Sequence, residues 1–481
     1  MDQITQEILD VLQEINSIPR CSKHEERIAN WLKEWSLSNG FNVRYDSVNN
    51  ILITVPASKG YETAPVVVIQ GHMDMVCEKD PASSHDFSKD PVDQYIDGDW
   101  LKARGTTLGA DNGIAIAMAL VLAKDKDLPH PPLELLFTVD EETGLTGANA
   151  LMPDFVSGKI LLNLDSEDEG VFIIGCAGGL NITIRIPLEY DTLPEGHIIC
   201  RLAVNGLAGG HSGIDIHEKR ANANKILAGC LEAVFTDLNV GLISMQGGSA
   251  HNAIPRQAEA LIAIPPHEYE DALSIVREME ENTASEYQEM DPTLSIRLLE
   301  QGEINECPLI KSKLVGDIIA LLKQLPHGVA RMSEDVPGLV ETSNNLATIT
   351  TCDNHFVILS SQRSSTDLGL AEITKKIEDM SKSAGATVTH NGAYPAWQPD
   401  PDSSLLQRSK NVYLETFGEK AAIEIIHAGL ECAVIGSKFR GMDMISFGPT
   451  IKNPHSPYEK LHIPSVSKVW QFLTALLASF S

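Results

Sequence analysis

The chain has 481 residues, more than one hydrophobic core usually accommodates, so two or more domains are expected. Its 37 basic and 66 acidic residues give a net charge of −29, which argues against nucleic acid and anionic membrane as partners. The N-terminal pattern is charged and amphipathic, unlike a signal peptide. No apolar run approaches the roughly 20 residues of a membrane span. Composition therefore favours a soluble cytoplasmic protein.

Eight cysteines are scattered along the chain, with no C-x-x-C pair. In a chain without a secretion signal, such cysteines are expected to be reduced and mostly buried. No cysteine-rich metal site is predicted.

Helices and strands alternate in the first third of the predicted structure. Apolar periodicity predicts helices over residues 4–15, 24–35 and 114–124, and strands over 51–55, 66–69, 133–139 and 160–164. The polar segment 77–100 is predicted to be a loop. Strands that alternate with helices indicate an α/β fold.

The pattern changes near residue 180, where two similar α+β sets follow one another without close sequence identity. The α/β pattern returns after Pro395. We therefore predict one α/β domain with a mixed central sheet, built from residues 1–179 and 392–481. An α+β insert of two similar halves, residues 180–391, interrupts it.

Several predicted strands of the α/β domain end in polar side chains. His72 and Asp74 follow the strand at 66–69 and are two residues apart, so an extended backbone points both to one side. Glu141 and Glu142 follow a second strand, and Asp165 follows a third. Taken singly, each has a structural explanation, such as a strand-end histidine or a solvated turn. In open α/β sheets, however, ligands bind at the carboxyl ends of the strands.

Taken together, two histidines and three or four carboxylates suit two divalent metal ions. Imidazole with carboxylate is typical of zinc, and also suits cobalt or manganese. A pair of ions needs a bridging carboxylate and leaves room for a bridging water. The residues alone do not separate the roles of Glu141 and Glu142.

Five motifs carry a resemblance to a known family. They are GHMD (71–74), GADNG (109–113), DEETG (140–144), NLDSE (163–167) and NPHSP (453–457). Their order resembles that of the aminoacylase/carboxypeptidase-type family of di-zinc exopeptidases, and the resemblance extends along essentially the whole chain. The N-terminal segment 18–25 (IPRCSKHE) also resembles a subgroup of this family.

The resemblance implies a role for each motif. The implied ligands of two ions are His72, Asp111, Glu142, Asp165 and His455. Asp111 would bridge the ions, and the Asp111–Asn112 peptide would be cis. Asp74 would orient His72 through its second ring nitrogen. Glu141 would be the general base that takes a proton from the bridging water.

The resemblance also identifies the insert as a lid. His211, in a GGHSG segment, resembles the lid histidine that stabilises the tetrahedral oxyanion. Asn252 and Arg363 resemble lid residues that hold a substrate's C-terminal carboxylate, which an arginine can bind with two parallel hydrogen bonds. A glycine turn, a strand entry and a surface arginine are the structural alternatives. Whether His211 serves the site of its own chain is left open.

The leading hypothesis is a metallo-dipeptidase that hydrolyses small unblocked dipeptides, including Xaa-His, with two zinc ions. An N-acyl-amino-acid deacylase or a carboxypeptidase of the same family is the alternative within enzymes. A non-catalytic scaffold or metal-binding protein is the alternative from another class. A homodimer is left open.

Overall fold

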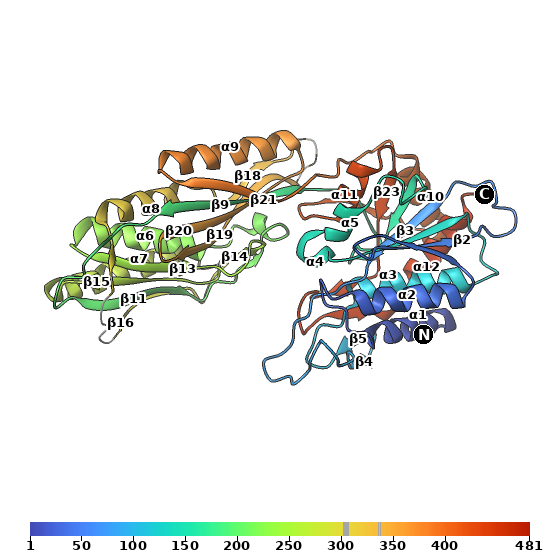
Figure 1. The fold of residues 1–481 in the computed structure, drawn as a ribbon, viewed down its shortest axis with the longest axis horizontal. Coiled ribbons are helices and arrows are strands. Elements are labelled where there is room, and N and C mark those ends of the chain that lie inside the picture. Colours follow the sequence, from blue (N-terminus) through green and yellow to red (C-terminus); the bar gives the residue numbers. More distant parts are fainter. Residues whose placement is uncertain (302–306, 335, 337) are drawn as a thin grey trace. The chain divides into compact units, whose positions relative to one another are not determined.

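The computed structural model describes residues 1–301, 307–334, 336 and 338–481 (Figure 1). It divides into two compact units. Unit 1 comprises Met1–Cys176, Trp397–Ile425 and Leu430–Ser481, and unit 2 comprises Ala177–Ala396 and Ile426–Gly429. The predicted boundaries, at 179/180 and 391/392, differ from these by a few residues. Residues 426–429, which lie outside the predicted insert, also belong to unit 2.

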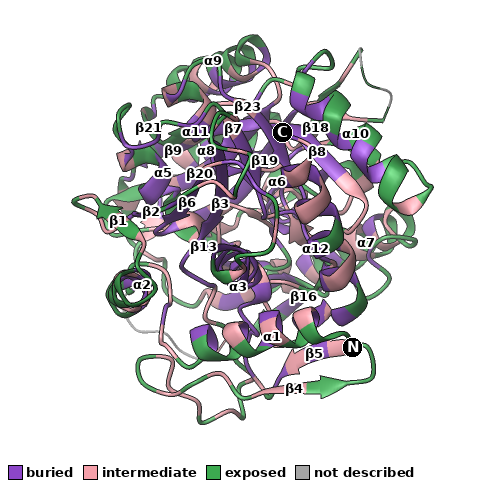
Figure 2. Ribbon diagram, turned by 90° about the vertical axis from the view of Figure 1, so that its right-hand side faces the viewer, coloured by how far each residue is buried: buried purple, intermediate pink, exposed green. Residues whose placement is uncertain are grey.

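A mixed eight-stranded sheet forms the centre of unit 1, in the order β1-β2-β6-β3-β7-β23-β8-β22. The strands are β1 (Asn42–Tyr45), β2 (Ile51–Val55), β3 (Val67–His72), β6 (Leu133–Thr138), β7 (Ile160–Asn163), β8 (Val171–Cys176), β22 (Ala422–Ile426) and β23 (Asp443–Ser446). Strands β3, β6, β7 and β23 run parallel, whereas β1 and β2 are antiparallel to their neighbours. The predicted α/β class and mixed sheet are confirmed. Strands β3 and β6 are buried along their whole length (Figure 2).

Helices cover both faces of this sheet (Figure 1). On one face, α1 (Gln3–Asn16) contacts both α3 (Ala110–Lys124) and α12 (Ile463–Ala478). On the other face, α5 (Thr146–Ala150) packs against α11 (Glu431–Lys438). Two further helices are α2 (Glu26–Ser38), beside β1 and β2, and α10 (Ser404–Phe417), against α12 and β23. Helix α3 is apolar and buried on all sides, because it lies between β3 and the outer helix α1.

A small sheet in the order β24-β25-β5-β4 completes unit 1. Its strands are β4 (Gln94–Asp97), β5 (Trp100–Ala103), β24 (Ile451–Lys452) and β25 (Lys460–His462). The prediction of a loop over 77–100 was therefore wrong at its end. The short, polar β4 carries no apolar alternation that would reveal it.

Unit 2 contains one large sheet whose main path is β16-β11-β15-β13-β19-β20-β9-β21. The strands on this path are β9 (Gly178–Pro187), β11 (Ile198–Asn205), β13 (Gly241–Gly247), β15 (Ala258–Ile264), β16 (Ser295–Glu300), β19 (Val340–Thr351), β20 (His355–Ser364) and β21 (Thr387–Tyr394). The helices are α6 (Ala223–Asp237), α7 (Tyr269–Glu286), α8 (Ser312–Gln324) and α9 (Asp367–Ser383), and their apolar faces share one core with the sheet.

The two halves of this sheet have the same topology. In chain order, β11-α6-β13-β15-α7-β16 corresponds to β9-α8-β19-β20-α9-β21. From the outer edge inward, the strand order is β16-β11-β15-β13 in one half and β21-β9-β20-β19 in the other. The halves join through the antiparallel pairing of β13 with β19. Unit 2 is thus an α+β body with an internal repeat.

The cysteine expectation requires one correction. Cys21 and Cys77 form a disulfide. A β-bridge between Cys21 and Met75 brings these segments together, with the two cysteine Cα atoms 5.7 Å apart. The separation of 56 positions hides this proximity in the sequence. The other cysteines, all within the described ranges, form no disulfide.

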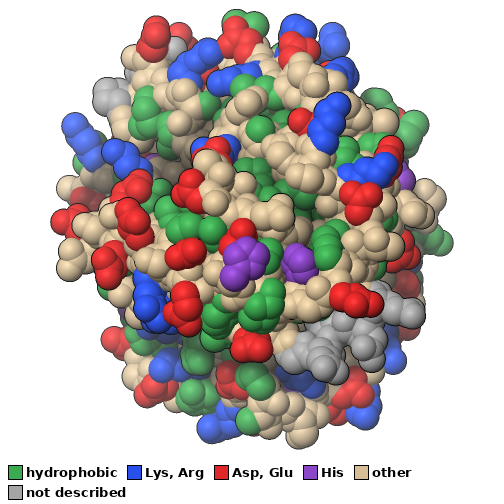
Figure 3. All heavy atoms as spheres, turned by 90° about the vertical axis from the view of Figure 1, so that its left-hand side faces the viewer, with side chains coloured by type: hydrophobic (Ala, Val, Ile, Leu, Met, Phe, Trp, Pro, Cys, Tyr) green, Lys and Arg blue, Asp and Glu red, His purple; other side chains and the backbone are tan. Residues whose placement is uncertain are grey.

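Acidic and basic side chains are interspersed on the face drawn in Figure 3, and the described residues there form no contiguous basic patch. Within the described ranges, no helix is long and apolar enough to cross a membrane.

Candidate dinuclear metal centre

The carboxyl ends of β3, β6 and β7 meet at one edge of the sheet of unit 1. His72 is the last residue of β3 and pairs with Thr138, the last residue of β6. The strand is therefore longer than the predicted 66–69, and His72 belongs to it. Gly71 is required here, because an added Cβ would lie 2.3 Å from the side-chain oxygen of Asn112. The absence of a side chain at Gly71 lets the segment after Asp111 approach the end of β3.

The structure brings the five expected ligands together in two groups, formed by His72, Asp111 and Asp165 and by Asp111, Glu142 and His455. Asp111 belongs to both. Its Oδ1 lies 3.1 Å from His72 Nε2, and its Oδ2 lies 3.1 Å from His455 Nε2. The second nitrogen–carboxylate contacts are 3.4 Å from His72 to Asp165 and 3.0 Å from His455 to Glu142. Each oxygen of Asp111 therefore faces one histidine, as a bridging carboxylate would.

The donor set fits a pair of divalent cations. It offers imidazole nitrogens and carboxylate oxygens, which are the ligands zinc accepts. In addition, Glu142 Oε1 is buried and has no hydrogen-bond partner among the described residues. A buried, unpaired carboxylate oxygen is costly unless a cation or a donor satisfies it. A third group, His72, Glu141 and Glu142, shows that Glu141 also lies at this centre.

The electrostatics of the cluster indicate a deficit of positive charge. Burial alone would lower the pKa of His72, but the charge of Asp165 and hydrogen bonds to carboxylates raise it well above its usual value. Burial also opposes the charge of His455, yet hydrogen bonds to two carboxylates raise its pKa to about 12. Burial raises the pKa of Glu141 well above its ordinary value. Divalent cations at this position would neutralise the carboxylates and displace the histidine protons.

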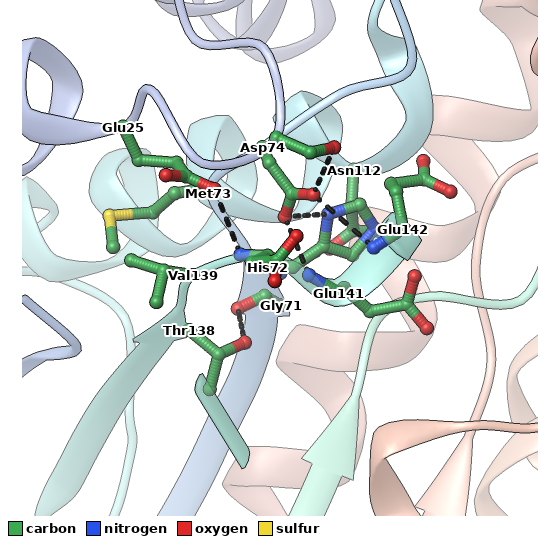
Figure 4. Close-up of polar contacts among 12 residues, drawn as sticks. Glu25, Gly71, His72, Met73, Asp74, Asn112, Thr138, Val139, Glu141 and Glu142 are labelled. Atoms are coloured by element: carbon green, nitrogen blue, oxygen red, sulfur yellow. Dashed lines mark hydrogen bonds and ion pairs between the residues drawn. The ribbon is translucent and has the colours of Figure 1, made fainter. Parts of the chain in front are cut away.

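Asp74 holds His72 and the following helix in place (Figure 4). It is fully buried, and its Oδ1 lies 3.2 Å from His72 Nδ1. Burial would raise its pKa, but the hydrogen bond to His72 contributes to a net lowering. The same carboxylate accepts the backbone N–H groups of Glu141, at 3.0 Å, and Glu142, at 3.2 Å. These two residues begin the short helix α4 (Glu141–Gly144). Asp74 thus fixes both a histidine and the two glutamates.

Asn112 connects the bridging segment to two strands. The Asp111–Asn112 peptide is cis, which confirms that expectation. Asn112 Oδ1 accepts the N–H of His72 at 3.2 Å, and Nδ2 donates to the carbonyl of Leu164 at 2.8 Å. Leu164 directly precedes Asp165. One amide side chain therefore links three ligand-bearing segments.

The three residues expected to contact substrate lie in unit 2. His211 belongs to β12 (Gly210–His211), which pairs with β14 (Ala253–Ile254). The adjacent Ser212 donates its N–H to the carbonyl of Asn252 at 2.8 Å, so His211 and Asn252 are neighbours in one loop pair. Arg363, on β20, is only 7% exposed and donates to Tyr394 Oη at 2.9 Å. The surface-arginine alternative is therefore wrong.

His427, in the short return segment of unit 2, was not singled out in the sequence. It is buried, and its Nε2 lies 2.7 Å from Ser343 Oγ. Burial, and then the charge of Arg363, lowers the pKa of His427 to about 3. The charge of His211 contributes to the same lowering, so Arg363 and His211 both lie near His427.

Glu431, Gln70 and Thr138 form a buried polar network at β3 and β6, and no role was predicted for it. Glu431, in the segment GLE at 429–431, is fully buried at the start of α11. It accepts hydrogen bonds from Gln70 at 2.5 Å and from Thr138 at 2.6 Å. Burial raises its pKa to about 8. The buried pair of Gln70 and Thr138 at the ends of otherwise apolar strands was the sequence signal for a polar partner.

Comparisons with known proteins agree with this geometry. The family model described as Peptidase family M20/M25/M40 matches residues 68–479. The chain is 42% identical over 472 residues to the cytosol non-specific dipeptidase of Escherichia coli, covering 98% of this chain and 97% of that protein.

Solved structures show the same fold. The aminoacylhistidine dipeptidase of Vibrio alginolyticus has a TM-score of 0.81 and 39% identity, covering 99% of this chain and 98% of that one. A tripeptidase of Staphylococcus aureus has a TM-score of 0.57 at 16% identity, covering 99% and 98% of the two chains, and shares the fold.

Proposed function

Because the chain belongs to the peptidase family M20/M25/M40, we propose that it is a metal-dependent dipeptidase that hydrolyses small unblocked dipeptides, including Xaa-His dipeptides. The family, the exopeptidase class and the dipeptidase activity follow from the relatives that match nearly the whole chain. The observation that carries the proposal at residue level is Asp111, shared between two ligand groups. The relative from Escherichia coli is named a cytosol dipeptidase, and we place the activity of this chain in the cytosol as well.

We propose two divalent ions, most simply zinc, with cobalt or manganese as alternatives. His72 and Asp165 would hold one ion, Glu142 and His455 the other, and Asp111 both. When bound, the ions polarise the scissile carbonyl and lower the pKa of water. Asp74 would keep His72 in the orientation and tautomer that a ligand needs.

Glu141 is the proposed proton carrier. It lies beside His72 and Glu142, and the two groups that share Asp111 do not include it. Its carboxylate would take a proton from the attacking water and give it to the leaving amine. The backbone N–H of Glu141 donates to Asp74, and this hydrogen bond fixes the position of the Glu141 backbone, from which its side chain extends.

For unit 2, we propose that His211 stabilises the oxyanion and that Asn252 and Arg363 bind the C-terminal carboxylate of the substrate. The buried, partly unpaired guanidinium supports this role, because Arg363 Nε has no hydrogen-bond partner among the described residues. A buried cation with a spare donor is suited to an anion.

The test is a dipeptide hydrolysis assay on chelator-stripped protein, repeated after adding zinc, cobalt or manganese. Free dipeptides, including Xaa-His, should be hydrolysed only after metal is restored. N-acetylated amino acids should be poor substrates. Preferential hydrolysis of acetylated amino acids would instead support the deacylase alternative, and metal-independent turnover would contradict the proposal.

A further inference from the structure

The N-terminal segment 18–25 has no role in the chemistry described above, yet it contains the bulkiest fully buried side chain in the described part of the molecule. Arg20 is 1% exposed. Burial lowers its pKa only to about 10, so the guanidinium is charged at neutral pH. A buried charge is tolerated when its hydrogen bonds are made by fixed partners. Those partners show what the residue does.

The guanidinium of Arg20 joins two ligand-bearing segments. Nη1 donates to the carbonyls of Met73, at 3.1 Å, and Asp74, at 2.9 Å, directly after the strand end with His72. Nη2 donates to the carbonyl of Gly109, at 2.5 Å, two residues before Asp111. It also donates to Asn16 on α1, at 3.2 Å. One side chain therefore holds the end of β3 beside the loop that carries the bridging carboxylate.

Glu459 holds the same loop from its other side. Its carboxylate is 3% exposed and accepts four consecutive backbone N–H groups. The donors are Leu108 at 2.7 Å, Gly109 at 2.9 Å, Ala110 at 2.8 Å and Asp111 at 3.2 Å. Glu459 follows His455 by four residues, so it ties the His455 segment to the Asp111 loop.

The loop at 108–111 is thus held between a buried guanidinium and a buried carboxyl group. Arg20 donates to the carbonyl of Gly109, and Glu459 accepts the N–H of the same residue. Gly109 has a φ of +71°, and an added Cβ would lie 2.5 Å from Arg20 Nη2. Only glycine allows this close approach. Arg20 and Glu459 do not belong to any ligand group found among the described residues.

Neighbouring contacts extend the same arrangement. Ser22 donates to Asp74 Oδ2 at 2.8 Å, and Glu25 accepts the N–H of Asp140, next to the two glutamates, at 2.9 Å. Arg20, Ser22 and Glu25 therefore contact residues next to the expected ligands and not the ligands themselves.

We infer that Arg20 and Glu459 are positioning residues that set the relative placement of the ligands His72, Asp111 and His455, and thereby the metal affinity of the centre. This inference rests on the proposed metal site. The three ligand segments are up to 383 positions apart in the sequence (455 − 72). Ligand supports of this kind change metal affinity by about 10- to 100-fold when they are mutated.

The variants Arg20→Lys and Glu459→Gln test this inference. Lysine keeps the charge but has a single ammonium, which cannot reproduce the fork that reaches two segments. Glutamine keeps the shape but replaces one accepting oxygen by a donor that opposes backbone N–H groups. We expect Zn²⁺ affinity, measured by chelator competition, to fall about 10- to 100-fold. The absorption spectrum of Co²⁺-loaded protein should change in both variants.

Glu134→Gln is the matched control. Glu134 is a buried carboxylate in β6 of the same unit, and it accepts the N–H groups of Ser157, at 2.9 Å, and Gly158, at 3.0 Å. It clamps a loop as Glu459 does, but that loop carries no candidate ligand. Its loss should lower thermal stability and leave Zn²⁺ affinity and the Co²⁺ spectrum unchanged.

The outcomes separate the two proposals. A parent protein that binds neither Zn²⁺ nor Co²⁺ would contradict the proposed function itself. A parent that binds metal, with positioning variants that bind it equally well, would overturn the positioning roles. If Glu459→Gln does not fold, Glu459→Asp replaces it, and an affinity equal to that of the parent would overturn the inference in the same way.

Discussion

Two histidines of unit 1, His72 and His455, lie in electrostatic surroundings opposite to those of His427 and His327 in unit 2. In unit 1, His72 and His455 face carboxylates, which raise their pKa values despite burial. In unit 2, burial and the charge of Arg363 together lower the pKa of His427 to about 3. Burial likewise lowers the pKa of His327 to about 4, with a contribution from Lys225.

This difference in electrostatic surroundings makes the two clusters suited to ligands of opposite charge. Imidazoles surrounded by carboxylates are suited to cations, whereas the neutral imidazole of His427 beside the buried guanidinium of Arg363 is suited to the proposed anion. A dipeptide substrate brings a carboxylate, and the proposed cofactor brings positive charge. The net charge of −29 does not reveal this difference between the two clusters, because it is the sum over the whole chain.

The largest effect on activity is expected from Glu141→Ala. This variant tests whether unit 1 can bind metal ions without catalysing hydrolysis. Loss of the proton carrier should lower kcat by about 100- to 10,000-fold. Metal content should remain that of the parent, because five ligands are unchanged. Turnover measured with metal analysis checks both statements. A variant as active as the parent would show that the general base lies elsewhere.

Metal removal should distinguish the units by stability. Zn²⁺ that binds only the folded centre stabilises unit 1 by mass action, by about 4 kcal/mol at 1,000 times its Kd. Amide hydrogen exchange should therefore accelerate in β3, β6 and α3 after chelation. Exchange in β11 and β15 should change little. Equal acceleration in both units would contradict a metal site confined to unit 1.

Arg363→Ala tests the anion side of the comparison. Loss of a charged hydrogen bond of about 1.5–3 kcal/mol should raise KM for free-acid dipeptides about 10- to 100-fold. Amidated dipeptides, which lack the carboxylate, should lose much less. Arg331→Ala is the control, because Arg331 is an exposed arginine in unit 2 whose ion pairs are with Glu341 and Glu372. If KM of Arg363→Ala is unchanged for both substrate types, Arg363 does not bind the C-terminal carboxylate of the substrate.

The smallest effect concerns acid stability. Well above pH 6.5, His327 and His427 are neutral in both the folded and the unfolded chain and contribute no pH dependence. As the pH falls from about 6.5 to about 4, the unfolded chain takes up protons that the folded chain does not, so unit 2 loses stability. Denaturant titrations that follow unit 2 should show this decline, and His327→Gln should reduce it. A decline identical in the variant would exclude His327 as a cause.

The chemically distinctive part of the site could be predicted from the sequence. His72 follows an apolar run, and Asp165 follows another, because buried parallel strands are continuously apolar. The ligand motifs then supplied the remaining residues through resemblance. The assignment of a ligand role to Glu142 and not to Glu141 came from resemblance alone, and it stays a prediction.

The supporting residues could not be predicted in this way. Arg20 and Glu459 have no periodic pattern, and their burial depends on backbone groups far away in the chain. Glu431 is held by Gln70, 361 positions earlier. The disulfide between Cys21 and Cys77 depends on the same long-range packing. Local sequence patterns carry periodicity, whereas these contacts arise only from the tertiary fold.

The wide spacing of the ligands has a consequence for the order in which the protein can be made. Unit 2 is one almost continuous stretch, Ala177–Ala396, and can begin to fold while later residues are still being synthesised. The metal centre cannot, because His455 and Glu459 belong to a segment translated after all of unit 2. We therefore expect the insert to be able to fold before its host domain can close. A chain that ended before residue 455 would lack one proposed ligand of the second ion.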